Sequence, residues 1–508
     1  MYSSDGYKIY NNELLNLVQD SKLGVDMHNV MVVSGVGQAD DTGLLSNNLQ
    51  KLNHILQLCV SYCQKYNVEL SPSKTKLMMI SPDKKTVVPF NPITIAGEQI
   101  EFVHQAEHVG VLRSTQGNLP NIVQRVAAFK KALGALISCG LARGRRTNPV
   151  LSLRILTIYG TPVLMSGLAS LVLSNGEVAS LDQQFKRTLQ NIIKLSTNSP
   201  SSLVHFVSGS LPCTAILHIK QITLFGMVCR LQSDPLNVLA NQVLLTSSPS
   251  SWFTQVRNLM LKYHLPHPLL LLDSPPTKEA FKALVKSKVV DYWEQKLRSE
   301  AAFLPSLIYF HPEYMSLTSP HRLWTTAGSN SYEVAKARIQ LLFLSSQYPC
   351  AKYTRHWSAD NPNGICSFSS CSTLNLVESP EHVLLQCPAY TTSREKMILM
   401  CLRSREPGVH QILTGFLMSN SAKIMQFLLD CSAIPEVIHL GQFLGEDIYK
   451  DLFYLSRTWC FTMHKERMKC LCRLAKCPST WPAHFAAVTT HSCAQLPSEA
   501  RPSSCSFA

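Results

Sequence analysis

The sequence lacks a long apolar segment. The longest candidate, residues 162–173, is interrupted by serine and falls short of the roughly 18 apolar residues that a membrane-spanning helix needs. Residues 1–13 contain no apolar core of the kind found in signal peptides. We therefore expect an intracellular protein, in the cytoplasm and nucleus, with no membrane partner.

Acidic residues are also scarce. The 508 residues include 47 Lys and Arg but only 33 Asp and Glu, which gives a formal net charge of +14. This surplus indicates an anionic partner, and nucleic acid is the natural one where basic residues cluster on helices. An apolar content of 45% with 16% charged residues is typical of several packed domains. The 17 cysteines are odd in number and many lie in apolar helical patterns, which favours reduced thiols over a disulfide framework.

The most informative motif is a pair of adjacent carboxylates, Asp40 and Asp41, in a glycine-rich segment. The apolar run 30–33 precedes them and Leu44 follows, so the pattern predicts a β-hairpin with both aspartates at its tip. Such a pair can bind two Mg²⁺ ions, which at about 3.5 to 4 Å apart stabilise an in-line phosphoryl displacement. An isolated Asp-Asp pair in a turn is more often a surface loop, so the surrounding segments decide.

Those segments favour the metal-binding interpretation. Apolar residues at helical spacing predict a helix from about Ser46 to about Tyr66. A turn and an apolar strand are predicted within residues 70–80, with Lys74 and Lys76 before the strand, and the segment IEFVHQAEHVGVLRS contains further short strands. Strands that alternate with a helix in this way predict an α+β domain.

In this order, the motifs resemble the reverse transcriptases of non-LTR retrotransposons. GQADDTGLL resembles the catalytic aspartate motif of that family, LSPSKTKLMMI its lysine motif and HVGVLRS its primer grip. Segments 209–231 and 452–469 and the Cys/His segment near residue 370 resemble regions downstream of the polymerase. The resemblance implies a partial right-hand polymerase palm, formed by the hairpin and a helix, followed by a mainly α-helical thumb and C-terminal region.

The resemblance also implies roles for individual residues. Asp40 would be a metal-binding catalytic aspartate and Asp41 its neighbour in the same site. Lys74 would be the acid that protonates pyrophosphate, with Lys76 as the second candidate. The implied cofactor is Mg²⁺, and the implied partners are an RNA template, a DNA primer or target, and deoxynucleoside triphosphates.

Two departures from the family pattern matter. Gln38 stands where the family usually has an aromatic residue or Cys before Ala-Asp-Asp. A third metal-binding aspartate is also expected on an earlier strand, but Asp5, Asp20 and Asp26 do not lie in an apolar strand followed by an aromatic residue. We therefore expect the chain alone not to polymerise. It is either the C-terminal part of a reverse transcriptase or a remnant that only binds nucleic acid.

A helical thumb would hold phosphates through basic side chains without reading bases. Residues 120–140 and the segment around Leu181 show helical apolar spacing, and basic residues decorate both segments and the loop between them. The solvent-exposed face of an ordinary amphipathic helix accounts for any one of these basic clusters about as well as nucleic-acid binding does. The candidate nucleic-acid-binding residues are Arg125, Lys130, Lys131, Arg143, Arg145, Arg146, Lys186 and Arg187.

A second metal site is predicted from Cys366, Cys371, His382 and Cys387. Three thiolates and one imidazole suit tetrahedral Zn²⁺, and a complete set of four ligands indicates a structural role or a grip on nucleic acid rather than hydrolysis. Ser379 is predicted to cap a short helix that carries His382. The gaps between ligands are wider than the family usually has, and four unrelated thiol and imidazole groups remain the alternative.

Shifts in pattern divide the chain further. His464 lies beside a basic run and is expected to be a surface donor rather than a metal ligand. The predicted parts are a partial palm at 1–115, a helical thumb at 116–245, a helical connector at 246–350, a zinc-binding module at 351–395, a C-terminal helical region at 396–477 and a disordered tail at 478–508.

Overall fold

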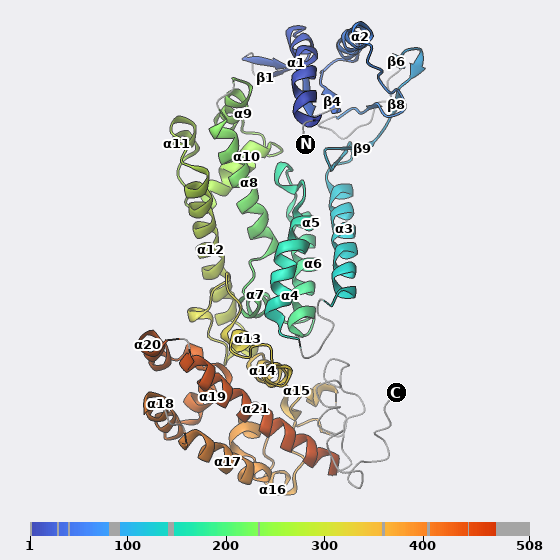
Figure 1. Ribbon diagram of the computed structural model, residues 1–508. Coiled ribbons are helices and arrows are strands. Elements are labelled where there is room, and N and C mark those ends of the chain that lie inside the picture. Colours follow the sequence, from blue (N-terminus) through green and yellow to red (C-terminus); the bar gives the residue numbers. More distant parts are fainter. Residues whose placement is uncertain are drawn as a thin grey trace. The chain divides into compact units, whose positions relative to one another are not determined.

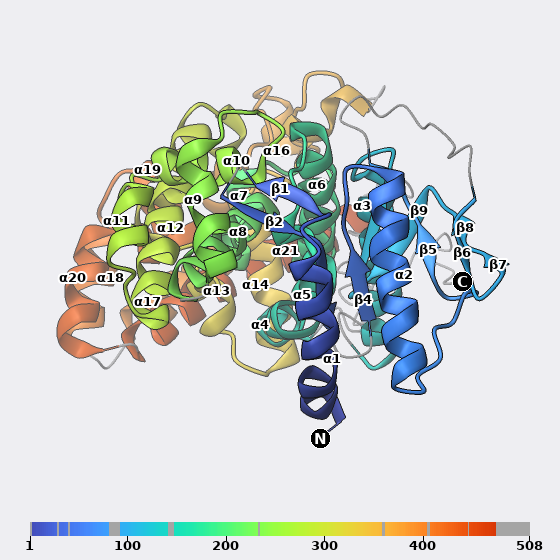
Figure 2. The same ribbon diagram turned by 90° about the horizontal axis from the view of Figure 1, so that it is seen from above.

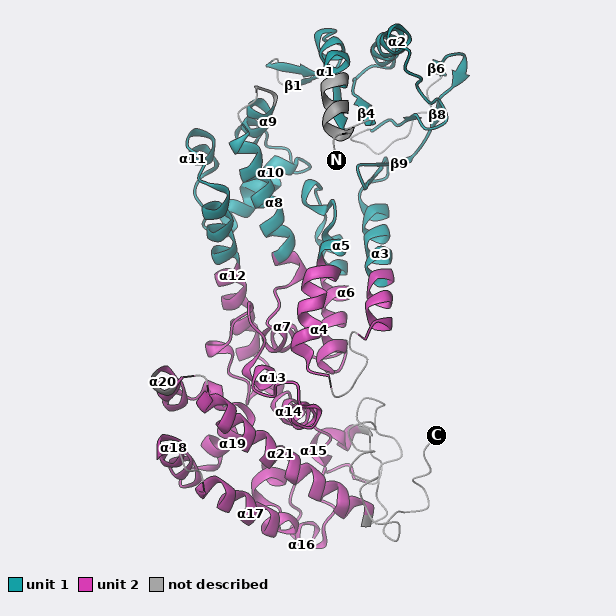
Figure 3. Cartoon of the chain, in the orientation of Figure 1, with its two compact units in different colours: residues 1–130, 162–181, 216–289 teal, residues 131–161, 182–215, 290–508 magenta. Residues whose placement is uncertain are grey.

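The computed structural model describes residues 3–27, 30–38, 41–80, 92–140, 147–231, 234–357, 361–403, 407–445 and 447–473. The chain divides into two compact units, which Figure 3 draws in different colours. Unit 1 comprises residues 1–130, 162–181 and 216–289, and unit 2 comprises residues 131–161, 182–215 and 290–508. The six-part division drawn from the sequence stays a prediction.

The described residues are mostly helical with a few small strands, which is compatible with the predicted α+β class. The strands are β1 (Val25–Met27), β2 (Met31–Val33), β3 (Gly35–Gln38), β4 (Asp41–Leu44), β5 (Lys76–Leu77), β6 (Thr94–Ile95), β7 (Glu98–Gln99), β8 (Glu101–Phe102), β9 (Gln105–His108) and β10 (Val111–Ser114). The α-helices are α1 (Ser3–Asp20), α2 (Leu49–Lys65), α3 (Leu119–Ser138), α4 (Pro149–Ile155), α5 (Thr161–Met165), α6 (Asn175–Ile193), α7 (Ser201–Ser208), α8 (Cys213–Arg230), α9 (Asp234–Leu245), α10 (Trp252–Lys262), α11 (Pro268–Asp273), α12 (Lys278–Ala302), α13 (Arg322–Thr325), α14 (Ser331–Leu344), α15 (Ala351–Thr354), α16 (Ser369–Ser372), α17 (Thr391–Leu402), α18 (Pro407–Leu417), α19 (Ser421–Asp430), α20 (Pro435–Leu444) and α21 (Asp447–Arg473).

A β-hairpin forms at the predicted place, but its first arm differs from the prediction. β3 pairs antiparallel with β4, whereas the apolar strand β2, at residues 31–33, pairs with β1. The glycines of β3 leave room for α1. A Cβ atom added at Gly37 would lie 2.9 Å from the Leu15 side chain, and one at Gly35 would lie 3.0 Å from the Val18 side chain, so a larger residue at either position would require these side chains to shift.

Helix α2 begins three residues later than predicted, because Asn48 caps it. The Asn48 side chain accepts hydrogen bonds from the backbone N–H groups of Gln50 at 2.7 Å and Lys51 at 3.3 Å. The buried face of α2 packs against α1 in a core cluster, and Figure 2 shows α2 running beside β4. Burial raises the pKa of Cys59 in this cluster to about 12, so the thiol stays protonated at neutral pH.

The hairpin of β9 and β10 contains a strained turn. Val111 pairs with His108, so only Val109 and Gly110 connect the strands, and both have positive φ, 52° and 71°. This conformation suits the tight right-handed twist of a two-residue hairpin. A β-branched side chain rarely adopts it, because its Cβ substituents crowd the backbone in the left-handed region.

We predict that Val109→Asn stabilises unit 1 by about 1 kcal/mol, because asparagine tolerates the left-handed conformation. The gain would be measured as a higher midpoint of urea unfolding. Val36→Asn is the matched control, since Val36 is also an exposed valine but lies in a strand, outside a positive-φ turn. An equal effect of both substitutions would show that side-chain polarity, not turn strain, governs the change.

The longest helix, α21, organises the C-terminal part of unit 2. Helices α14, α17, α19 and α20 all pack against it, as Figure 1 shows. Among the described residues, the stretch Ser421–Gln442 is long and apolar enough to cross a membrane, but 56% of its most apolar window is buried inside the protein. Helices α7 and α8 would be a second candidate only if the two were taken together as one span, although the chain bends by 66° between them. Core helices pass the same test, so no membrane is implied.

Candidate metal centre and basic surface

The structure brings the four predicted zinc ligands together. Ligand atoms of Cys366, Cys371, His382 and Cys387 all lie within 4.8 Å of one another, and the Cys371 and Cys387 sulfurs are 3.8 Å apart. All four side chains are buried, with exposed fractions of 2% or less. This buried cluster can hold a metal ion, and its donor atoms are consistent with Zn²⁺.

The loop before the cluster is fixed by backbone contacts. Ile365 forms an isolated antiparallel bridge with Val377, and the Cys366 N–H donates to the Leu376 carbonyl at 2.8 Å. Gly364 has a φ of 66°, and a Cβ atom there would lie 3.0 Å from the Ala351 carbonyl oxygen. These contacts set the position of Cys366, and only glycine fits at residue 364.

The helix that carries the third ligand is capped as predicted. The His382 N–H donates to the Ser379 hydroxyl at 3.1 Å. The turn η6 (His382–Gln386) is π-helical, and the Cys387 N–H closes it by donating to the His382 carbonyl at 2.8 Å. This wider turn places the fourth ligand against the third, and Pro388 then begins a new 3₁₀ turn, η7 (Pro388–Tyr390).

The chemistry of the cluster fits a metal ion. His382 Nε2 is buried and has no hydrogen-bond partner among the described residues, which is costly unless a metal accepts its lone pair. Burial raises the pKa of the Cys371 thiol, and a divalent cation would reverse that effect by stabilising the thiolate. Four protein ligands leave no open position, so the centre is suited to a structural role.

A buried ion pair joins this module to α21. The Arg467 Nε and Nη2 atoms donate to the two carboxylate oxygens of Glu378 at 2.9 and 2.8 Å. The same carboxylate accepts from the Ala351 N–H at 2.7 Å, and Arg467 also donates to the Pro349 carbonyl at 3.1 Å. Burial alone would raise the pKa of Glu378, but the Arg467 guanidinium holds it below its ordinary value. Glu378 therefore stays ionised.

The prediction that His464 lies on the surface was wrong. Its exposed fraction is 1%, and its Nδ1 atom lies 3.0 Å from the Tyr348 hydroxyl. Burial lowers the pKa of His464 to about 3, so the imidazole is neutral at physiological pH. The basic residues around His464 are typical of an exposed helix face. In the structure, this part of α21 instead packs against the rest of unit 2. Neither Glu378 nor Arg467 was singled out from the sequence, since no spacing rule links residues 89 positions apart.

The residues implied in phosphoryl transfer lie in unit 1. Asp41 is the first residue of β4 and is exposed, and Asp40 lies outside the described residues. Lys74 is exposed in the turn before β5. Lys76 forms an ion pair with Glu101 across β5 and β8. The Mg²⁺ site stays a prediction.

The candidate nucleic-acid residues differ in their surroundings. Lys130, Lys131 and Arg187 are exposed. Arg125 donates to the Gly110 carbonyl at 3.1 Å, and Lys186 is half-buried, with a pKa that burial lowers and Glu300 partly restores. The loop residues Arg143, Arg145 and Arg146 lie outside the described residues.

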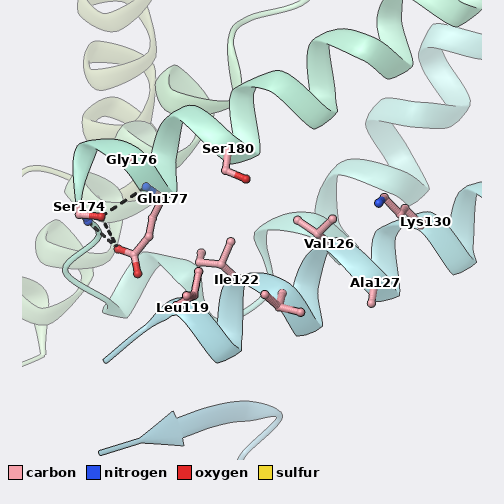
Figure 4. Close-up of a pocket in the computed structure, with 10 residues that line it drawn as sticks. Leu119, Ile122, Val126, Ala127, Lys130, Ser174, Gly176, Glu177 and Ser180 are labelled. Carbon is pink, nitrogen blue, oxygen red and sulfur yellow. Dashed lines mark hydrogen bonds between the residues drawn. The ribbon is translucent and has the colours of Figure 1, made fainter. Parts of the chain in front are cut away.

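A groove of about 510 Å³ runs between α3 and α6 in unit 1, as Figure 4 shows. The α3 wall is apolar except for Lys130 at one end. At the other end, Glu177 accepts from the Ser174 N–H at 2.7 Å, so its carboxylate caps α6. The lining residues are Leu119, Ile122, Val123, Val126, Ala127, Lys130, Ser174, Gly176, Glu177 and Ser180.

We predict that the purified protein contains about one Zn²⁺ per chain, held by the Cys₃His set. Cys387→Ser should release the metal and lower the thermal midpoint of unit 2, because the buried site then lacks a soft ligand. Zinc would be measured by elemental analysis, with Cys139→Ser, an exposed thiol outside the cluster, as the control. Metal-free wild-type protein after zinc-supplemented expression would refute the assignment.

Arg467→Met should destabilise unit 2 by about 3 to 5 kcal/mol, because it leaves the Glu378 carboxylate buried and unpaired. The double variant Arg467→Met with Glu378→Met should regain most of this loss, since it removes both charges. Unfolding in urea measures both effects. Lys450→Met, which breaks an exposed ion pair with Asp447 on the same helix, is the control and should change stability little.

Comparisons of the chain with protein-family models, with curated proteins and with solved structures found no match.

Proposed function

We propose that this chain is the C-terminal part of an RNA-directed DNA polymerase, the reverse transcriptase of a non-LTR retrotransposon. The observation that supports this most strongly is the register of the β3–β4 hairpin. Gln38, the last residue of β3, pairs with Asp41, the first residue of β4, so two residues of the motif pair with each other at one end of the hairpin. The order of hairpin, helix α2 and lysine turn along the chain matches the order of the motifs in that family.

In this proposal the two adjacent carboxylates bind Mg²⁺. Hard oxygen ligands suit this ion, and an exposed carboxylate such as that of Asp41 is accessible to it. Mg²⁺ would neutralise the charge that develops on the attacking and leaving oxygens during nucleotidyl transfer. Asp40 and Asp41 hold the metal, and Lys74 donates a proton to the departing pyrophosphate.

The remaining parts support substrate binding. Exposed Lys130, Lys131 and Arg187 would contact phosphates of an RNA template and DNA primer, which predicts affinity that is independent of sequence and falls with salt. The Cys₃His centre would stabilise the fold of unit 2 rather than take part in the chemistry. The resemblance assigns two metal-binding carboxylates to this sequence, whereas the family uses a third. The proposed activity would therefore require further sequence joined to this chain.

The decisive experiment reads the genomic sequence in frame before Met1 and expresses the chain joined to it. We predict magnesium-dependent primer extension on an RNA template that falls by roughly 10²- to 10³-fold in Asp40→Ala and in Asp41→Ala. Lys74→Ala should lower the rate of nucleotide addition by about 10²-fold, as loss of a general acid does, and Lys76→Ala should lower it less.

Asp20→Ala is the matched control, because Asp20 is an exposed aspartate of unit 1 outside the hairpin. It should leave extension and RNA binding unchanged. Extension that survives both hairpin substitutions would refute the assignment of the metal site. Salt-sensitive RNA binding without extension by the joined polypeptide would favour the alternative, a retrotransposon remnant that only binds nucleic acid.

A further inference from the structure

The first half of helix α12 carries mostly positive charge. Residues 278–289 contain four lysines and one acidic residue, Glu279. Lys278, Lys282 and Lys286 follow one another at four-residue steps, so they lie in a row along one side of the helix, about 6 Å apart along its axis. All three side chains are exposed. These three residues, here called the lysine row, belong to unit 1.

The apolar side of this helix is fixed in the core of unit 1. Phe281, Val285 and Val289 are at most 1% exposed. A Cβ atom at Gly226 of α8 would lie 2.3 Å from the Phe281 ring, so the two helices pack closely (Figure 1). The lysine row is therefore carried by an ordered helix, and its spacing does not depend on the conformation of a loop.

The lysine row lacks carboxylate partners. Within the described part of the chain, α12 forms ion pairs in its second half. Lys296 lies 4.0 Å from Glu300, and Arg298 lies 2.8 Å from Glu294. None of the described acidic residues forms an ion pair with a lysine of the row. The positive charge of the row is therefore open to an anion from outside the chain.

This arrangement opposes the stability of the helix itself. Like charges four residues apart repel each other, so the lysine row contains two unfavourable pairs. Lys278 also lies in the first turn, near the positive end of the helix dipole, where acidic residues are preferred. Glu279 offsets the second effect but not the repulsion within the row. A pattern that disfavours the folded helix is expected where a residue serves a function.

The surroundings of the row decide which kind of anion it suits. A helix that lies on a membrane inserts an apolar face into the lipid. Within α12, all of which the structure describes, no large apolar side chain is exposed. Protein interfaces are anchored by Trp, Tyr and Arg, whereas the row consists of lysines alone. Lysine is a compact point charge that contacts phosphates without the fixed geometry of a guanidinium. A chain of phosphates fits these properties best.

We propose that the lysine row is a docking surface for the phosphodiester backbone of nucleic acid, in addition to the basic residues of α3 and α6. Each ammonium group contacts a phosphate, and no base is read, so binding is independent of sequence. The inference deepens the proposed function and rests on it for the class of partner. It does not depend on the Mg²⁺ site.

The test measures the affinity of the full chain for a labelled DNA duplex over a series of salt concentrations, with a labelled single-stranded RNA as the second arm. Lys282→Gln combined with Lys286→Gln removes two phosphate contacts and keeps good helix formers. Binding at about 0.1 M salt should weaken by roughly 10- to 60-fold. The slope of log affinity against log salt should fall by about 1.8 for the duplex and about 1.4 for the RNA.

Two further variants separate the row from net charge and from folding. Lys396→Gln combined with Lys423→Gln removes the same formal charge from exposed positions on α17 and α19 and should leave affinity and slope nearly unchanged. Replacement of Lys282 and Lys286 by arginine keeps the charge and should keep the affinity. The glutamine variant of the row should melt at the same temperature as wild type or higher, because it relieves like-charge repulsion.

Unchanged affinity and slope in the glutamine variant of the row would overturn the proposal and leave the proposed polymerase function standing. Equal weakening by the control pair on α17 and α19 would overturn it too, because net charge would then govern binding. Weaker binding to vesicles of anionic lipid, with nucleic-acid binding unchanged, would identify a membrane surface instead. A wild-type chain that binds neither probe at low salt would overturn both this inference and the substrate-binding part of the proposed function.

Discussion

The Arg467–Glu378 ion pair is the interaction on which the C-terminal half of the molecule depends. Both side chains are almost fully buried, at 5% and 4% exposure, and they hydrogen-bond to each other and to backbone groups. A pair of this kind is costly to bury but far costlier to break. Glu378 lies between the second and third metal ligands, so the pair ties the metal-binding loop to α21 and, through α21, to α14 and α17.

Metal binding and helix packing therefore stabilise the same conformation. A divalent cation bound by the Cys₃His set would hold both ends of the loop that contains Glu378 and would keep the carboxylate in place for Arg467. A second contact acts in the same direction, since the Trp459 indole N–H of α21 donates to the Leu384 carbonyl at 3.2 Å, within the turn that joins His382 to Cys387. Because a ligand that binds only the folded state stabilises it, metal affinity adds to the stability of the helical bundle.

Local signals in the sequence were sufficient for local structure. The Ser379 cap and the hairpin at the Asp-Asp motif were predicted, because each depends on residues only a few positions apart. The pairing of β3 rather than residues 31–33 with β4 was missed, because two glycines in β3 gave it no apolar strand pattern, whereas β2 pairs with β1 instead. The burial of His464 was missed for a similar reason. A helix with many basic residues is normally exposed, whereas here its packing within unit 2, including the contact of His464 with Tyr348, buries the imidazole.

The two candidate metal sites have different chemistry and belong to different units. The Cys₃His set has soft ligands, is buried and offers no open coordination position, so it cannot activate a nucleotide or a water molecule. The segment around Asp41 has hard oxygen ligands and is exposed, which suits Mg²⁺ and a large anionic substrate. Removal of Zn²⁺ should therefore act on the stability of unit 2. In the proposed function, phosphoryl chemistry would depend on the carboxylates of unit 1, so a loss of activity after chelation of zinc would reflect folding rather than catalysis.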